Sequence, residues 1–270
     1  MPAIWLPLPV HAQWRAAAEL GAGRVAQPEA VARAAATANA SIGWLRESMA
    51  VMGSGGITLP SAGDRRSHAE LAAVLRSDPR RPFSIEVTGV ASAYDESRFP
   101  RMLSGFGGAR VHARSGRLVF WGGGAAGSLD DGAFTYPHTL LEGGVATAWR
   151  FMRFTAGATR NSTLGEPRVE FTDDPPVALP VRDRLRYTDG NITVQARPPR
   201  LEIDGRLGMR LVQRTIAYED LPSARVFGAA SAAWWMTPRL ALAASVGHEL
   251  ADLARGLPGA RYATLGMRVR

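Results

Sequence analysis

Residues 83–270 alternate apolar and polar side chains with a period of two. In the segment 109–114, for example, Arg110, His112 and Arg114 alternate with smaller apolar residues. Successive side chains of a β-strand point to opposite faces, so this period predicts strands with one apolar and one polar face. About ten such runs follow one another, each near the length of a tilted membrane strand. We therefore predict an all-β fold, an antiparallel up-and-down β-barrel of about ten strands over residues 83–270.

The connections between these runs differ in length in a way typical of outer-membrane barrels. Short turns stand at Arg197-Pro-Pro199 and Met236-Thr-Pro238, whereas residues 162–182 and 248–259 are long and polar. We expect the protein to lie in the bacterial outer membrane and to have the lipid of that membrane as a partner. A periplasmic β-barrel or sandwich is the alternative, because a sheet with one solvated face shows the same alternation. Aromatic residues near predicted strand ends, as in an interfacial girdle, favour the membrane: Phe120, Trp121, Trp149, Phe151, Trp234 and Trp235.

Residues 1–80 lack this period and are expected to form an N-terminal leader, partly helical or irregular. The apolar segment 4–10 is a possible residual signal segment, although the first basic residue is Arg15. The pattern predicts a helix within 28–48, with Pro28 in its first turn, and a short helix within 67–76. Glycine-rich residues 53–56 and residues 60–63 are predicted loops. A plug or additional barrel strands are the alternatives for this segment.

Composition excludes several classes of protein. All 32 basic residues are arginine and the formal net charge is +8. These arginines are scattered among apolar residues, whereas nucleic-acid binders gather charge on one face, so we expect no nucleic-acid partner. The chain has no cysteine, and therefore neither a disulfide framework nor thiolate chemistry. No apolar run reaches the roughly 18–20 residues of a membrane helix.

The motif search indicates no enzyme, cofactor or metal site. Residues 122–127 match G-x-G-x-x-G, but a turn-like segment follows them where a dinucleotide site needs a helix. The five histidines have no paired metal-ligand spacing, and no nucleophile elbow is present. The acidic pairs Asp130-Asp131 and Asp173-Asp174 are typical of turns, where Asp forms local hydrogen bonds.

The polar faces of the predicted strands would line the lumen of the barrel. Unpaired charges are costly away from water, so facing arginines and carboxylates predict a salt-bridged filling. The alternative is an anion-selective pore lined by uncompensated arginine. Because about ten strands enclose little more space than a filled eight-stranded barrel, we prefer the filled barrel. The predicted lumen-facing charged cluster comprises Arg110, His112, Arg114, Arg153, Glu202, Asp204, Arg206 and Arg210, and the residues predicted to face outward include Leu201, Ile203, Leu207, Met209 and Leu211.

Three stretches carry a resemblance to a known group of proteins. They are Leu185–Asp189 with Pro199–Arg210, then Ala232–Val246, and Pro258–Arg268. They resemble the closing strands of uncharacterised outer-membrane β-barrel proteins from GC-rich bacteria. The resemblance covers residues 83–270 through strand-and-turn patterns. It implies a barrel and an envelope location, but no activity.

Taken together, these patterns predict an outer-membrane β-barrel protein with a structural, adhesive or minor transport role and no catalytic activity. The alternative is a soluble periplasmic β-barrel or sandwich that binds a small or anionic ligand. A small anionic or carbohydrate ligand is the partner that a polar, arginine-rich lumen would suit. The sequence leaves the oligomeric state open.

Overall fold

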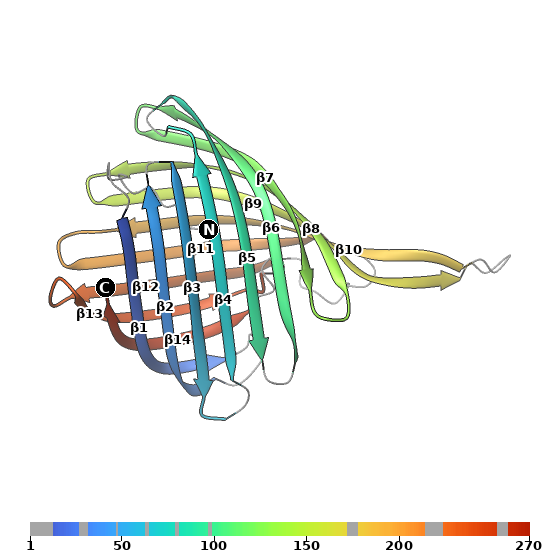
Figure 1. Cartoon of the computed structure of the whole chain (residues 1–270), viewed down its shortest axis with the longest axis horizontal. Helices are drawn as coiled ribbons and strands as arrows, with labels where there is room; N and C mark the ends of the chain where they lie inside the picture. The colour runs from blue at the N-terminus through green and yellow to red at the C-terminus, as the bar shows by residue number, and fades with distance from the viewer. Residues whose placement is uncertain are drawn as a thin grey trace.

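The chain forms a closed antiparallel β-barrel of fourteen strands (Figure 1). The computed structural model describes residues 13–26, 32–46, 48–62, 65–78, 81–96, 99–171, 178–213, 224–252 and 259–270, with the backbone alone at 99–100, 165–171 and 178–184. Each strand pairs with its neighbours in sequence, and β14 pairs with β1 to close the barrel. The strands are β1 (Gln13–Ala26), β2 (Arg33–Arg46), β3 (Met49–Pro60), β4 (Arg66–Arg76), β5 (Phe83–Glu96), β6 (Phe99–Ser115), β7 (Leu118–Asp130), β8 (Thr135–Trp149), β9 (Met152–Phe171), β10 (Ala178–Ala196), β11 (Leu201–Gln213), β12 (Ala224–Trp235), β13 (Leu240–Glu249) and β14 (Ala260–Val269).

The two ends of the barrel differ in their connections. One end, which we call the turn end, carries the β2–β3, β4–β5, β6–β7, β8–β9, β10–β11 and β12–β13 connections. Two of them are tight turns, since Ser115 pairs with Leu118 and Trp149 pairs with Met152. Strand β1 begins and β14 finishes at this end too. The opposite end, the loop end, carries all the other connections, including the one between β13 and β14.

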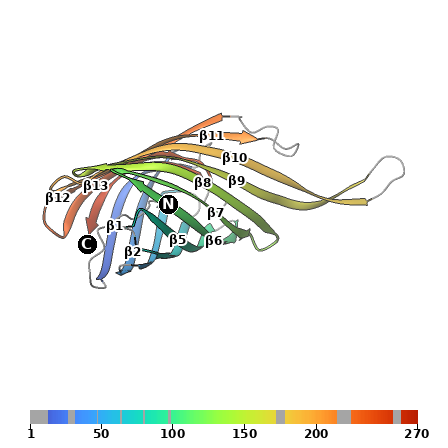
Figure 2. The ribbon, with the colours of Figure 1, turned by 90° about the horizontal axis from the view of Figure 1, so that it is seen from above.

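The strands are tilted, and one hairpin extends well past the others. In Figure 1 the strands of the front wall, β1–β6, cross the direction of those of the back wall, β9–β13, as tilted strands on opposite walls must. Strands β9 and β10 project from the loop end as a two-stranded ribbon in both views (Figures 1 and 2). Their pairing continues to Phe171 opposite Ala178.

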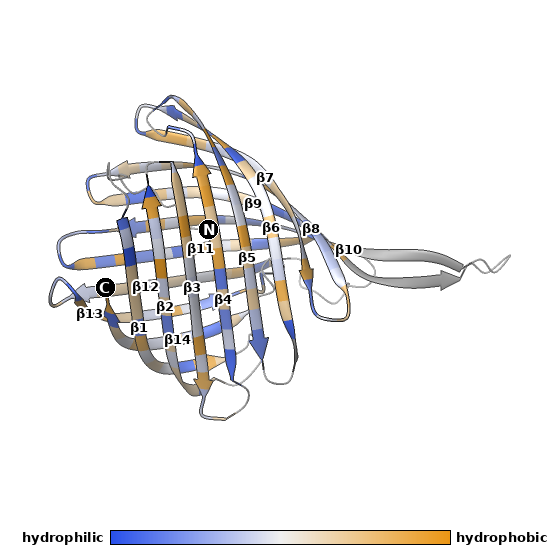
Figure 3. Cartoon of the chain, viewed as in Figure 1, coloured by the Kyte–Doolittle hydropathy of each residue, from blue (hydrophilic) through white to orange (hydrophobic). Residues whose placement is uncertain are grey.

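The outer surface of the barrel is apolar. Apolar and polar residues alternate along the strands (Figure 3), and the apolar ones on the outer face are widely exposed. Trp14, Leu20, Phe83 and Leu207 each leave 65–71% of their surface uncovered. Water would disfavour an apolar surface of this extent, whereas hydrocarbon accepts it and a closed barrel leaves no edge unpaired. The chain is a transmembrane β-barrel of the bacterial outer membrane, as predicted.

Aromatic side chains mark the turn end of this outer surface. Trp14 is the second residue of β1, Phe83 begins β5, Trp149 ends β8 and Phe151 lies in the β8–β9 turn, all with at least 49% of their surface exposed. Aromatic rings prefer the interface between hydrocarbon and water, so they indicate where the hydrocarbon ends on this side. None of the described residues belongs to a helix long and apolar enough to cross a bilayer.

The prediction of about ten strands with a partly helical N-terminal segment is wrong. Residues 13–76 supply four strands, β1–β4, and the described residues form no helix. The predicted helices within 28–48 and 67–76 coincide with β2 and β4, and the predicted loop 53–56 lies inside β3. These segments are rich in alanine and glycine, so their two faces differ little in polarity, and alanine favours helix until pairing overrides it. The possible signal segment 4–10 lies outside the described residues.

The predicted long loop at 162–182 is also wrong. Most of it continues β9 and β10, which pair from Thr163 opposite Leu185 onward. A single register shift between Arg182 and Arg184 interrupts the ladder. Polar residues and prolines interrupt the alternation in this stretch of the sequence, so the period that identifies a membrane strand is absent from it.

Candidate functional site: a lumen of paired charges

The inward face of the barrel carries its charged side chains. Inward residues alternate with the exposed apolar ones, so Arg110 and His112 lie between outward Ala109, Val111 and Ala113. Contacts between strands that are not neighbours, such as those between β11 and β14, can form only through the lumen. The interior therefore provides the chemistry of this protein, and the exterior provides its membrane anchor.

One group of charges spans β5 to β8. Arg110 on β6 donates to Glu86 on β5 over 3.2 Å and binds both carboxylate oxygens of Glu142 on β8, with 2.8 Å from Nη2 to Oε2. Glu142 is two strands away, so the guanidinium must cross β7. It crosses at Gly123, which pairs with Arg110 on one side and with Glu142 on the other. His112, buried on the same face of β6, approaches Glu86 at 3.7 Å.

An inward tryptophan packs beside this group. The indole of Trp121 on β7 lies over Gly144 and Gly157, the residues directly opposite it on β8 and then β9. A Cβ atom at Gly144 or Gly157 would lie within 2.8–3.0 Å of Trp121 Cζ2. The Arg110 guanidinium is 5.4 Å from the indole centroid, within the range of a cation–π contact. The two glycines thus make room for a large ring that narrows the lumen.

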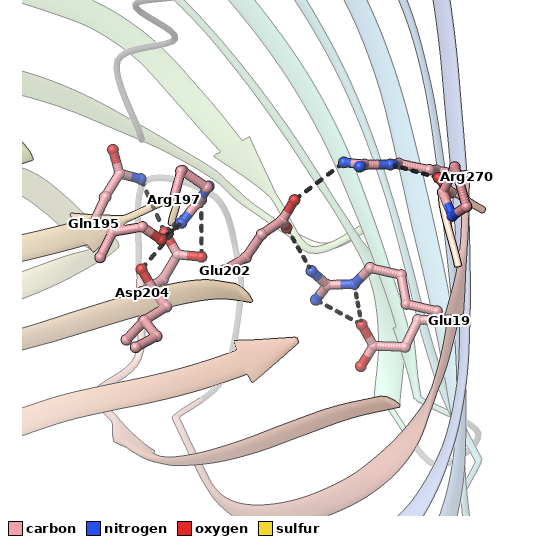
Figure 4. A network of polar contacts seen from close by, with 10 residues as sticks. Glu19, Gln195, Arg197, Glu202, Asp204 and Arg270 are labelled. Carbon is pink, nitrogen blue, oxygen red and sulfur yellow. Dashed lines mark hydrogen bonds and ion pairs between the residues drawn. The ribbon is translucent and has the colours of Figure 1, made fainter. Parts of the chain in front are cut away.

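A second group lies at the turn end and crosses the lumen (Figure 4). Arg268 on β14 binds Glu19 on β1 at 2.7 Å and Glu202 on β11 at 3.5 Å. Arg270 also binds Glu202, at 3.2 Å, and its guanidinium lies 3.8 Å from the Trp235 ring centroid. Glu202 is therefore shared by two arginines that come from three strands away. We call Glu19, Glu202, Arg268 and Arg270 the turn-end network.

Small residues make this crossing possible. Strands β12 and β13 lie between Glu202 and the two arginines, and their inward residues here are buried: Ala233, Trp235, Ala241 and Ala243. The alanines leave space above them for the long side chains to meet. Beside this network, Nη2 of Arg197 donates to both carboxylate oxygens of Asp204 at 2.8 and 3.0 Å, and Gln195 donates to the same carboxylate.

A cavity of about 230 Å³ lies in the loop half of the lumen. Residues of β5–β13 and of the β13–β14 connection line it. Arg210 on β11 binds both oxygens of Asp189 at 2.7 and 2.8 Å and donates to the carbonyl of Ala251 at 2.7 Å. The last contact holds the start of the β13–β14 connection inside the lumen, where Leu250 is buried. The Arg210 guanidinium also lies 3.8 Å from the ring centroid of Tyr187.

Polar groups continue along the cavity wall. The Asn161 side-chain amide donates to the Tyr187 hydroxyl at 2.9 Å, and the Thr163 hydroxyl donates to Asn161 at 3.0 Å. Arg206 differs from the other arginines of the cavity. Its guanidinium stacks 4.8 Å from the Phe227 ring centroid, and no carboxylate of the described residues lies within ion-pair distance of it.

The eight residues predicted to form one lumen-facing cluster are distributed along the interior. Arg110 and His112 belong to the β5–β8 group, and Arg114 follows them toward the β6–β7 turn. Arg153 begins β9 on the inward face, opposite Ala148 of β8. The other four lie on β11: Glu202 and Asp204 near the turn end, and Arg206 and Arg210 beside the cavity.

Sequence reasoning missed several residues that complete these groups. Glu19 fell in the segment interpreted as a leader, and Asp189 was not assigned a partner. Trp121 was placed in an interfacial girdle, whereas its indole faces the lumen glycines. The alternation along β7 could have shown that Trp121 faces the lumen. Phe120, one residue earlier, faces outward with 47% of its surface exposed, and neighbouring residues of a strand face opposite sides.

The described residues contain no cluster of three or more histidine, cysteine or acidic side chains able to hold a metal ion. The G-x-G-x-x-G stretch 122–127 lies within β7, where its glycines alternate between the two faces of the barrel wall. Nothing in this geometry makes a phosphate-binding turn at the start of a helix.

No protein-family model matches the chain, and no curated protein sequence matches it. Solved structures are similar to it as barrels. A porin is 7% identical over 95% of this chain and 99% of its own, with a TM-score of 0.47. The TodX monoaromatic hydrocarbon channel, as a deletion mutant, is 8% identical over 96% and 90%, with a TM-score of 0.49. OmpF of Salmonella typhi in complex with daunomycin is 8% identical over 95% and 97%, with a TM-score of 0.46.

This likeness extends to general barrel architecture and no further. The strand pairing and the apolar exterior show the outer-membrane barrel that the sequence resemblance implies. The narrower resemblance, to barrels from GC-rich genomes, stays a prediction.

Proposed function

We propose that this protein is an outer-membrane channel for small hydrophilic solutes. The observation that supports this most is the polar cavity inside a barrel whose outer surface is apolar. Charged, amide and hydroxyl groups line the cavity, so a polar solute can exchange its water for protein contacts there. A structural barrel can also carry paired charges inside it, but it needs no cavity among them.

The dimensions favour small solutes. Fourteen strands enclose more space than the filled eight-stranded barrel and less than the open 16–18-stranded porins. The expectation of a filled barrel was based on about ten strands, and fourteen strands remove that basis. Long side chains still narrow the passage, at Trp121 with Arg110 and at the turn-end network. A solute must pass both positions to cross the barrel.

One observation favours a second candidate, a structural barrel without a conducting path. The turn-end network joins β1, β11 and β14 through the lumen, as a filling would. The side chains of this network leave 21–51% of their surface exposed, however, which indicates room for water among them. Hydrated charges of this kind suit a selective constriction better than a sealed core.

Planar-bilayer recording of the purified barrel separates the two candidates. A channel gives single-channel steps, and the Glu202→Gln variant, which removes one lumen carboxylate, shifts the reversal potential toward that of the anion. Ile203→Val is the matched control, because Ile203 is the next residue and faces outward. Its conductance and selectivity should equal those of the parent protein. Folded, inserted barrels that never conduct would refute the channel and leave the structural candidate.

A further inference from the structure

The loop-half cavity holds two groups of opposite charge that the barrel does not pair with each other. Its lining contains three arginines and four carboxylates. Two arginines are neutralised locally: Arg110 by Glu142 and Glu86, and Arg210 by Asp189. Arg206 is the remaining cation. Glu249, at the end of β13, is a carboxylate of the same lining.

Arg206 and Glu249 flank one tyrosine. Arg206, Ala229, Gly247 and Tyr262 are register partners in a single row across β11 to β14. The Tyr262 ring turns back over Gly247, where a Cβ atom would lie 2.7 Å from its hydroxyl oxygen. That hydroxyl donates to Glu249 at 3.2 Å. The cation and the carboxylate therefore lie on the same wall of the cavity, on strands that β12 alone separates.

Neither charge has an ion-pair partner among the described residues. The Arg206 guanidinium contacts the face of Phe227, and the contact that fixes Glu249 is the neutral hydroxyl of Tyr262. A free anion would be attracted by Arg206 but repelled by Glu249. A free cation would be attracted by Glu249 but repelled by Arg206. A molecule that carries both charges close together satisfies both poles at once.

We propose that this cavity binds a small zwitterion of the α-amino acid class, with its carboxylate on Arg206 and its ammonium on Glu249. The volume of about 230 Å³ lies below the roughly 300–1,000 Å³ typical of sites for drug-sized ligands, so it suits a ligand of few heavy atoms. Asn191, Thr88 and Thr159 add amide and hydroxyl groups to the lining. The proposal deepens the proposed channel function by naming the class of solute that it admits.

The test uses calorimetric titration of the full chain in detergent with three probes: L-alanine, N-acetyl-L-alanine and L-alaninamide. The first carries both charges, the second only the negative one and the third only the positive one. We expect L-alanine to bind most tightly, with each blocked analogue weaker by about tenfold, as expected for the loss of one charge-assisted contact. Arg206→Gln and Glu249→Gln should each weaken L-alanine by a similar factor.

Arg160→Gln is the control, because Arg160 is exposed on the outer face of β9 and should leave binding unchanged. Equal binding of L-alanine and N-acetyl-L-alanine would replace the zwitterion site with a simple anion site and overturn the proposal. So would the absence of L-alanine binding to the folded barrel. Conductance without binding would reject this site while keeping the channel, and binding without conductance would do the opposite.

Discussion

Gly123 lies directly between Arg110 and Glu142, and its missing side chain allows the guanidinium to cross β7. A Cβ atom at Gly123 would lie 2.8 Å from Arg110 Cα and 2.9 Å from Arg110 Cγ, and it would also meet the carbonyl oxygen of Ala109. Contacts with backbone atoms are not relieved by rotating a side chain. The ion pair between β6 and β8 therefore depends on a glycine in the strand that separates them.

Gly123→Ala should destabilise the barrel by about 1–3 kcal/mol, the usual cost of overpacking a well-packed site. The strain falls on the ladder between β6 and β7 and displaces Arg110 from Glu142. Urea titration of the protein in detergent measures the change. Gly122→Ala is the matched control, since its Cβ would lie 3.8 Å from the nearest atom outside its chain neighbours, and its effect should stay within about 0.5 kcal/mol. Equal effects of the two substitutions would contradict this account.

The β10–β11 turn contains a strained arginine. Arg200 has φ +62°, and the amide of Leu201 donates to the carbonyl of Pro198 at 3.1 Å. With Pro199 in the second position and a positive φ in the third, this turn favours glycine where Arg200 stands. Arg200→Gly should therefore stabilise the barrel by about 1 kcal/mol, which the urea midpoint would report.

Arg150, in the β8–β9 turn, provides the comparison for that prediction. It has φ +52°, but its guanidinium also lies 5.4 Å from the Trp149 ring centroid. Arg150→Gly relieves the same backbone strain and loses this contact, worth about 0.5–1 kcal/mol at an exposed site. We expect Arg150→Gly to gain clearly less than Arg200→Gly. A larger gain at position 150 would show that backbone strain is not the controlling factor.

The β7–β8 loop should respond to acid through Asp131. Slight burial is the largest single influence and by itself raises the pKa of Asp131. Hydrogen bonds from the Phe134 amide, the Tyr136 hydroxyl and the Ala133 amide outweigh it and lower the pKa below its usual value of 3.8. A carboxylate with a lowered folded-state pKa stabilises the loop fully above its unfolded pKa. This stabilisation is lost as the pH falls through the folded pKa.

Hydrogen exchange tests this directly. The protection factors of the Ala133 and Phe134 amides should fall as the pH drops below about 4, and Asp131→Asn should lower them at neutral pH and remove most of the pH dependence. The amide of Gly132 is an internal control, because it donates to Asp130 at 2.7 Å and should keep its protection in the variant. A Phe134 protection factor that stays constant through the acid range would exclude this role for Asp131.

The sequence allowed prediction of strands where the two faces differ sharply in polarity. In β11 the apolar Leu207 and Met209 alternate with Arg206 and Arg210, and the structure exposes the first two on the outer face. In β2 the run Ala34–Ala36 offers no such contrast, since inward Ala35 is as apolar as its outward neighbours. Alternation identifies a strand only when the lumen side is polar, and β1–β3 line their part of the lumen mainly with small residues.

The ion-pair partners of the lumen charges could not be predicted from the sequence, for a different reason. Glu202 contacts Arg268 across two intervening strands, and the distance between them depends on the register of every pair from β11 to β14. A shift of one residue in any pair would turn one side chain toward the lipid. Periodicity gives the face of a residue, whereas its ion-pair partner depends on strand number, tilt and register together.

The projecting β9–β10 ribbon also limits where the hydrocarbon can reach. In the described pairing, β9 does not pair with β8 beyond Thr163, and β10 does not pair with β11 before Arg186. Each strand there has one paired neighbour in place of two. Backbone groups along such free edges need water as their partner, because unsatisfied groups are too costly in lipid. On the β9–β10 side, the hydrocarbon must therefore end at Thr163 and Arg186 or nearer the turn end, and polar headgroups or bulk water must surround the ribbon beyond them.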